Sequence, residues 1–146
     1  MEPAKSFRDL NVYQTAREAA NRIFQLSKKF PAEERYSLTD QIRRSSRAVK
    51  AMITEAWARR RYKAVFINKI DEAHGEAAET RSWLDDCKDA QYITTDDFTD
   101  LEKRYDAIGG MLSRMIDRAD DFCKHTPSND YRNVVREEED SPFTDH

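Results

Sequence analysis

The sequence predicts an all-α protein, an antiparallel up-down-up-down four-helix bundle with a flexible acidic C-terminal tail. Three observations indicate this fold class. The chain of 146 residues has only three glycines and four prolines. Alanine, glutamate, arginine and aspartate are frequent, and runs of β-branched residues are few. Apolar residues recur every three or four positions in four long segments. The connections between these segments are short, which makes neighbouring helices antiparallel.

The first helix is predicted over residues 9–29. Asp9 is suited to cap its N-terminus, and Phe30-Pro31 ends it, because the residue before a proline avoids the helical region. Its apolar positions share one helix face, and they are Val12, Tyr13, Ala16, Ala20, Ile23, Phe24 and Ser27.

The second helix is predicted over residues 38–60. The preceding Ser37-Leu-Thr-Asp40 has the S-x-x-D form of a capping box. The basic residues of this segment fall mostly outside its apolar stripe. That stripe contains Leu38, Ile42, Ser45, Val49, Met52, Ile53, Ala56 and Trp57.

The third and fourth helices are predicted over residues 62–90 and 96–123. In the third, small residues at Ala73 and Ala77 allow a neighbouring helix to approach closely. Thr94-Thr-Asp-Asp97 is expected to cap the fourth helix. Gly109-Gly110 interrupts its regular stripe, which indicates close helix contact or a bend. The fourth stripe contains Phe98, Leu101, Tyr105, Ile108, Leu112, Met115, Ile116, Ala119 and Phe122.

Charge divides the chain into contrasting segments. The predicted bundle domain, 1–125, is followed by an acidic tail, 126–146, which has a net charge of −4 and reads as disordered. Residues 41–63 have a net charge of +7, whereas residues 71–102 have a net charge of −9. The overall charge of −3 therefore conceals a strong polarity.

Four blocks of the chain carry a family resemblance. They are FRDLNVYQTARE, KKFPAEERYSLTDQIRRSS, FINKIDEAHGEAAETRSWLDDCKDAQYI and DLEKRYDAIGGMLSRMI, which together span about 7–123. The chain resembles the four-helix bundle proteins whose founding members are encoded in intervening sequences of bacterial 23S rRNA genes. The segment Lys50–Ala56 matches that family at Ile53 and Glu55 but lacks its proline, asparagine and glycine.

The resemblance implies a left-handed bundle, usually assembled as a ring-like homopentamer, with no established enzymatic activity. Some relatives look like accessory proteins of diversity-generating retroelements, which bind nucleic acid and a reverse transcriptase and are strongly basic. The resemblance therefore adds RNA, single-stranded DNA and a protein such as a reverse transcriptase to the candidate partners.

Three polar residues are expected on buried surfaces. Glu55 lies beside the apolar stripe of the second helix, and His74 and Arg81 on the third helix are its candidate partners. A buried carboxylate must be paired or hydrogen-bonded. A structural polar pair is preferred to a general acid–base role, because no second catalytic group accompanies Glu55.

No motif for catalysis or metal binding is complete. Asp71-x-x-His74 places two ligands on one helix face, but a bundle di-iron site needs that spacing twice and two further glutamates. The chain has no glycine-rich phosphate loop, G-x-S-x-G or H-E-x-x-H. The sequence therefore predicts a protein that is not an enzyme and has no cofactor or metal.

The basic segment has two functional interpretations. Arg59, Arg60, Arg61 and Lys63, at the helix end, are candidates for contacting RNA or single-stranded DNA, because cations neutralise phosphates. In the other interpretation, the basic segment meets the acidic segment of a second copy, which gives register and specificity. That interface would contain Arg43, Arg44, Arg47, Lys50, Trp57 and Trp83. A simple solvated face, and tryptophans that only fill a core or interface, remain alternatives.

Cysteine usage and hydropathy indicate a cytoplasmic protein. Cys87 and Cys123 have no paired spacing and are expected to be buried and reduced. The first residues, MEPAKS, lack the apolar region of a signal peptide. No apolar stretch is long enough to span a membrane.

Overall fold

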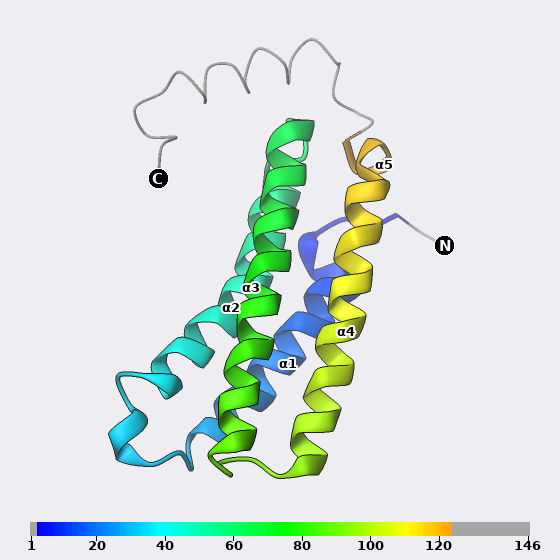
Figure 1. The fold of residues 1–146 in the computed structure, drawn as a ribbon. Helices are drawn as coiled ribbons and strands as arrows, with labels where there is room; N and C mark the ends of the chain where they lie inside the picture. Colours follow the sequence, from blue (N-terminus) through cyan, green and yellow to red (C-terminus); the bar gives the residue numbers. More distant parts are fainter. Residues whose placement is uncertain (1–2, 124–146) are drawn as a thin grey trace.

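The computed structural model describes residues 3–123. Four long helices run alternately in opposite directions (Figure 1), which confirms the predicted all-α four-helix bundle. They are α1 (Asn11–Ser27), α2 (Leu38–Ala58), α3 (Lys63–Asp89) and α4 (Thr95–Asp117). A short helix, α5 (Ala119–Cys123), follows α4, and two 3-10 turns, η1 (Phe7–Asp9) and η2 (Ala32–Glu34), flank α1.

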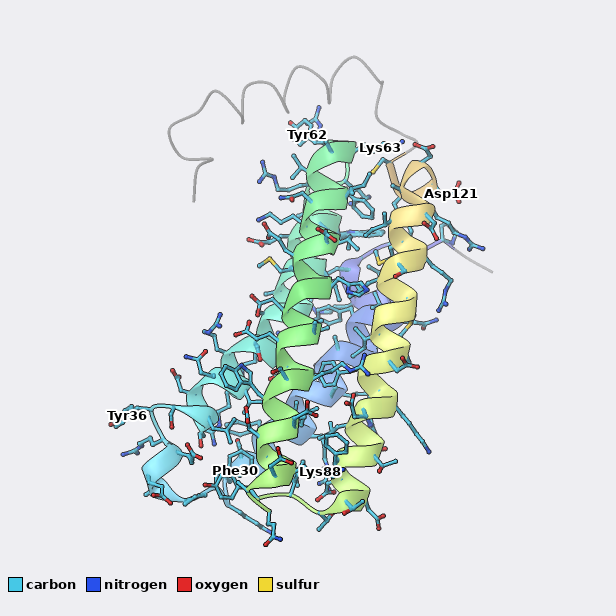
Figure 2. All side chains as sticks on the ribbon, viewed as in Figure 1. Phe30, Tyr36, Tyr62, Lys63, Lys88 and Asp121 are labelled. Carbon is cyan, nitrogen blue, oxygen red and sulfur yellow. The ribbon has the colours of Figure 1, made fainter. Side chains whose placement is uncertain are left out.

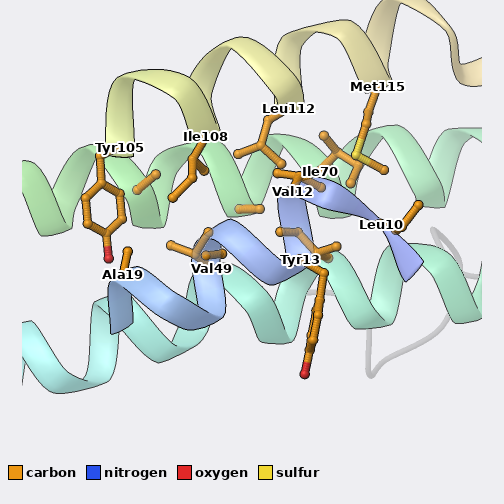
Figure 3. Packing of buried hydrophobic residues seen from close by; sticks show 14 of the residues in the cluster. Leu10, Val12, Tyr13, Ala19, Val49, Ile70, Tyr105, Ile108, Leu112 and Met115 are labelled. Carbon is orange, nitrogen blue, oxygen red and sulfur yellow. The ribbon is translucent and has the colours of Figure 1, made fainter. Parts of the chain in front are cut away.

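Each helix packs on the next along the chain, and α4 also packs on α1, so the bundle is closed. Figure 3 shows the core that this closure creates, with Val49, Ile70, Tyr105 and Leu112 contributed by α2, α3 and α4. These four side chains are almost completely buried. Burial of a large apolar side chain contributes about 1.5–3 kcal/mol, so the apolar stripes supply the main stabilising term.

Small residues bring α2 and α3 together, as Ala73 and Ala77 predict. Both alanines are buried, and the hydroxyl oxygens of Ser45 on α2 and Thr80 on α3 lie 2.8 Å apart in a hydrogen bond. Larger side chains at these places would hold the two helix backbones further apart.

Of the three predicted N-terminal helix caps, the structure confirms one and differs from two. Thr94 caps α4, since its hydroxyl accepts a hydrogen bond from the Asp97 backbone N–H at 3.0 Å. The prediction for Asp9 is wrong, because its carboxylate closes a capping box with Ser6 around η1. Ser37 lies at the N-cap of α2 but makes no capping bond, because its hydroxyl donates to the Glu34 carboxylate at 2.7 Å.

The α3–α4 connection contains the single described non-glycine residue with a positive φ, Gln91 at 62°. The Tyr92 N–H donates to the Cys87 carbonyl at 2.9 Å. This is the Schellman type of helix end, in which a left-handed residue closes the last turn.

The predicted fourth helix, 96–123, is interrupted, but not at its glycines. The helix continues through Gly109 and Gly110, and a Cβ at Gly109 would lie 3.8 Å from His74 Nε2. The break falls at Arg118, between α4 and α5. The Phe122 ring of α5 then stacks on Phe66 of α3, with ring centroids 5.4 Å apart.

The predicted boundary between a bundle domain and an acidic tail, at residues 125 and 126, lies outside the described residues. The predicted disorder of that tail therefore stays a prediction.

Candidate nucleic-acid interface

The basic residues of α2 divide between two faces of the helix. Arg44 faces α3, where its guanidinium pairs with Glu79 at 3.1 Å. Arg43, Arg47 and Lys50 face α1 instead. These three positions recur every three or four residues, so they share one stripe from which position 44 is turned by about 100°.

Three cationic side chains on the α1–α2 face contact the ring of Phe24 on α1. The charged groups of Lys28, Arg43 and Arg47 lie 4.9, 4.8 and 5.0 Å from its centroid. Arg43 Nε also donates a 2.7 Å hydrogen bond to Ser27 Oγ. Each such cation–π contact contributes about 0.5–1 kcal/mol at an exposed site.

A groove between α1 and α2 lies beside this ring. We name it the basic groove, and it is lined by Gln14, Arg17, Glu18, Ala20, Asn21, Phe24, Arg47 and Lys50. Arg17, Arg47 and Lys50 form no ion pair with any other described residue. Glu18 is the single carboxylate of the lining, and its Oε2 lies 3.8 Å from Arg104 on α4. The groove is therefore cationic, because its lining has three positive side chains and one negative side chain.

The predicted nucleic-acid residues lie outside this groove, since Arg59, Arg60 and Arg61 are in the α2–α3 turn and Lys63 is the first residue of α3. Figure 2 shows Tyr62 and Lys63 at one end of the bundle. Arg60 stacks on Trp57 at 4.0 Å and donates to the Trp57 carbonyl at 2.8 Å. The guanidinium of Arg61 lies 5.3 Å from the Tyr62 ring centroid.

Lys63 contacts the Asp120 carboxylate of α5, and the Arg59 N–H ends α2 by donating to the Glu55 carbonyl at 3.0 Å. At 1.5 Å per residue, Arg60 lies about 20 Å along the helix axis from Arg47. The structure thus gives two separate basic surfaces where the sequence indicates one run.

Five of the eleven carboxylates of the acidic segment, residues 71–102, form ion pairs with described residues of their own chain. Several of its carboxylates bind arginines across helix pairs, as in Arg22–Asp97 at 2.7 Å and Arg81–Glu102 at 2.7 Å. Such exposed pairs each contribute about 0–1 kcal/mol. The predicted contact between the basic segment of one copy and the acidic segment of another stays a prediction.

The two tryptophans of the predicted oligomer interface are partly buried against the core. Trp83 Nε1 donates a hydrogen bond to Glu79 at 3.4 Å, and the Arg60 guanidinium lies over the Trp57 ring. Neither indole is fully covered within one chain, and their role between copies stays a prediction.

The prediction of buried polar residues is wrong for Glu55 and Arg81, and it holds in part for His74. Glu55 is 50% exposed and lies 3.7 Å from Lys69, because it projects away from the α2 stripe between Ile53 and Ala56. Arg81 is 44% exposed and reaches Glu102 on α4, since its long side chain can leave the apolar face. His74 is half-buried, 3.5 Å from Ser113.

The buried polar groups are mostly hydroxyls of serine and threonine. The hydrophobic pattern of a sequence does not predict whether these small residues are buried or exposed. Ser45 and Thr80 are fully buried between α2 and α3. One oxygen of Glu76, a turn before Thr80, is buried without a hydrogen bond to a described residue. Burial, followed by the neighbouring Glu79 charge, raises the pKa of Glu76.

Neither cysteine is suited to nucleophilic chemistry. Both are free and buried, and burial raises the pKa of Cys87 to about 12 and that of Cys123 to about 11. A nucleophilic cysteine needs a thiolate. Across the described residues, no group of three His, Cys, Asp or Glu side chains is placed to hold a metal ion. Across residues 3–123, every helix is too short or too polar to span a lipid bilayer.

The sequence model of the 23S rRNA-intervening sequence proteins matches residues 8–114. A solved structure from Bacteroides thetaiotaomicron, a protein of unknown function from the S23 ribosomal protein family, is 32% identical. The match covers 73% of this chain and 95% of that chain, with a TM-score of 0.66. No curated protein matches. The closed four-helix bundle and the extent of these two matches agree, and the chain belongs to the 23S rRNA-intervening sequence protein family.

Proposed function

We propose that this protein is a non-enzymatic, homo-oligomeric accessory protein that binds single-stranded nucleic acid, RNA or DNA, through the basic groove between α1 and α2. The observation that carries the proposal is the set of unmatched cations in that groove. Arg17, Arg47 and Lys50 line it, and Lys28 and Arg43 adjoin it on the Phe24 ring.

Electrostatics explains why a protein with a net charge of −3 is still suited to this role. Binding of nucleic acid depends on the cations that neutralise phosphates and release counterions, so the local charge matters more than the total. Charges further apart than about 8 Å are largely screened at physiological salt. The acidic residues of α3 and α4 are therefore compatible with a phosphate on the α1–α2 face.

The α2–α3 turn supplies a second set of cations. Arg60 and Arg61 lie on aromatic rings at the end of the bundle, where a base or a phosphate can reach them. Several copies in one assembly would repeat both surfaces, which strengthens binding to a long strand through effective concentration. The homopentamer that the family resemblance implies is part of this proposal, and a reverse transcriptase remains one candidate protein partner.

The alternative function is an oligomeric scaffold for protein–protein interaction that binds no nucleic acid. The partly exposed indoles of Trp57 and Trp83 favour it, because tryptophan is enriched at interfaces. The two functions differ in one direct measurement, which is the binding of a labelled single strand at low salt.

The test uses anisotropy of a labelled single-stranded RNA between about 50 and 200 mM salt, the range in which phosphate contacts change affinity most. The variant is Arg17→Gln/Arg47→Gln/Lys50→Gln. If these residues contact three phosphates, the slope of log K against log salt should fall by about 2, at about 0.7 per contact. Affinity at low salt should fall by tenfold or more.

A matched control removes the same charge from paired arginines. In Arg22→Gln/Arg44→Gln/Arg81→Gln, each lost cation is one that pairs with a carboxylate across helices. The control should leave the slope nearly unchanged. Equal losses in both variants, or no binding of the wild-type protein at about 50 mM salt, would overturn the nucleic-acid function. Sedimentation tests assembly separately, and a monomer at micromolar concentration would overturn the homo-oligomer.

A further inference from the structure

A second groove lies where the α1–α2 connection meets the final turns of α3. We name it the acidic groove. It is lined by Glu34, Tyr36, Gln41, Trp83, Asp86 and Asp89, together with Ser37, Leu38 and Ala90. Figure 2 shows Tyr36 at the end of the bundle opposite to Tyr62 and Lys63. The groove is thus distant from the α2–α3 turn, and it shares no lining residue with the basic groove.

Three carboxylates give this groove its charge. Glu34 accepts hydrogen bonds from Ser37 Oγ at 2.7 Å and Tyr92 OH at 3.0 Å. These two bonds lower the pKa of Glu34, so the group is charged at neutral pH. Asp86 and Asp89 are exposed and form no ion pair with a described residue.

The nearby cations do not cancel that charge. Arg44 reaches Gln41 at the edge of the groove, but its guanidinium pairs with Glu79. Arg35 lies outside the lining, with its guanidinium 5.8 Å from the Tyr36 ring centroid. Three carboxylates therefore face one unpaired cation, and the groove remains negative.

Two aromatic side chains accompany the carboxylates. Tyr36 is 85% exposed and is the single large hydrophobic side chain exposed to this degree among residues 3–123. Trp83 is partly exposed at the same groove. An aromatic ring beside carboxylates is suited to a guanidinium or ammonium group, because the ring attracts the cation and covers its alkyl stem while a carboxylate matches the charge.

We propose that the acidic groove binds an arginine- or lysine-rich extended segment of a partner protein. Asp86 and Asp89 pair with the cationic groups of that segment, and Tyr36 and Trp83 pack against their stems. Nucleic acid is excluded from this surface by repulsion. The basic turn of a second copy, with Arg60 and Arg61, is the competing occupant, which sedimentation distinguishes from a partner segment.

This inference does not rest on the proposed function, since the two grooves have opposite charge and different lining. Together they describe a bundle with two binding surfaces, one for a polyanion and one for a cationic peptide. Separate variants can therefore remove one activity and leave the other in place.

The test measures binding of a labelled oligoarginine peptide to the full chain by anisotropy, with oligoglutamate as the negative probe. The variants are Asp86→Asn/Asp89→Asn and, separately, Tyr36→Ala. The aspartate pair should weaken binding by about tenfold and Tyr36→Ala by about threefold, magnitudes typical of a few screened charges and one exposed cation–π contact. Tyr36 is so exposed that its replacement should leave folding unchanged.

The control is Asp106→Asn/Asp117→Asn, which removes the same charge from exposed positions of α4. It should change affinity by less than twofold. The proposal is overturned by an equal effect of both aspartate pairs, by no effect of Tyr36→Ala, or by no peptide binding at low salt. It is also overturned if Tyr36→Ala changes only the sedimentation of the protein, because the groove would then be a contact between copies. At about 150 mM salt, where charges are screened beyond about 8 Å, RNA binding should be unchanged in all these variants.

Discussion

The hydroxyl oxygens of Ser45 on α2 and Thr80 on α3 lie 2.8 Å apart in a fully buried hydrogen bond. Thr80 Oγ1 also lies 2.9 Å from the Glu76 carbonyl of its own helix, whereas Ser45 has only a long contact of 3.5 Å with the Ile42 carbonyl. Thr80 is therefore the better satisfied of the two, and Ser45 depends on it.

The first prediction concerns this pair. Thr80→Val keeps the shape of the side chain and leaves the Ser45 hydroxyl poorly satisfied, so it should lower the free energy of unfolding by about 1–2 kcal/mol. Ser45→Ala should cost less, and Ser45→Ala/Thr80→Val should cost less than the sum of the single changes, because both partners are then apolar. Urea denaturation of the four proteins measures the coupling. If the loss of stability in the double variant equals the sum of the two single losses, the prediction is wrong.

The second prediction concerns Gln91, whose φ of 62° is disfavoured for a residue with a Cβ. Gln91→Gly should raise the free energy of unfolding by about 0.5–1 kcal/mol, since glycine adopts this conformation without strain. Gln91→Ala is the control, because it changes the side chain but keeps the Cβ. Thermal unfolding should place the glycine variant above both other proteins, and a lower melting temperature for it would contradict the prediction.

The third prediction concerns pH and Glu76. Burial raises the pKa of Glu76 above its ordinary value of 4.5, so the folded state disfavours the charged form. The contribution of Glu76 to the stability of the wild-type protein therefore falls as pH rises from 4.5 through the raised value. Glu76→Gln should be more stable than wild type at pH 7 by less than about 1 kcal/mol. Below pH 4.5 the advantage should disappear, because both side chains are then neutral.

Glu72→Gln serves as the control for Glu76, because that carboxylate is exposed and pairs with Lys69 at 3.3 Å. It should give no gain at pH 7. Denaturant unfolding at several pH values distinguishes the two, and a Glu76→Gln advantage that persists at low pH would show that shape rather than charge causes it.

The fourth prediction concerns the charge of the segment 137–139. Glu137→Gln/Glu138→Gln/Glu139→Gln keeps the length of the chain and changes its formal charge from −3 to 0. If the basic groove binds RNA, this change should strengthen binding severalfold at about 50 mM salt and have no effect near 1 M, where charges are screened beyond about 3 Å. A gain that is independent of salt would show a cause other than charge.

Periodicity predicted all four helices because each one buries a continuous stripe against its neighbours. The same argument failed at Arg81, which shares the stripe of Ala77 and Leu84 but has a side chain long enough to reach solvent. It also passed over the break at Arg118, since Ile116, Ala119 and Phe122 keep the apolar spacing on both sides of it.

The candidate site was less predictable than the fold. Arg17 was not singled out, because it lies in a segment of balanced charge and joins Arg47 and Lys50 only when α1 packs on α2. The acidic groove is likewise assembled from a loop and a distant helix end. Surfaces of this kind depend on which helix faces meet, and a linear charge map does not contain that information.

The position of Phe24 has one more consequence. An ion pair orders an arginine but also cancels its charge, so a phosphate must displace the carboxylate before it can bind. The Phe24 ring orders Arg43 and Arg47 without contributing a formal charge. These long side chains have therefore lost part of their conformational entropy before a ligand binds, so the surface is preorganised for an anion. The two arginines also keep their full positive charge, which attracts that anion.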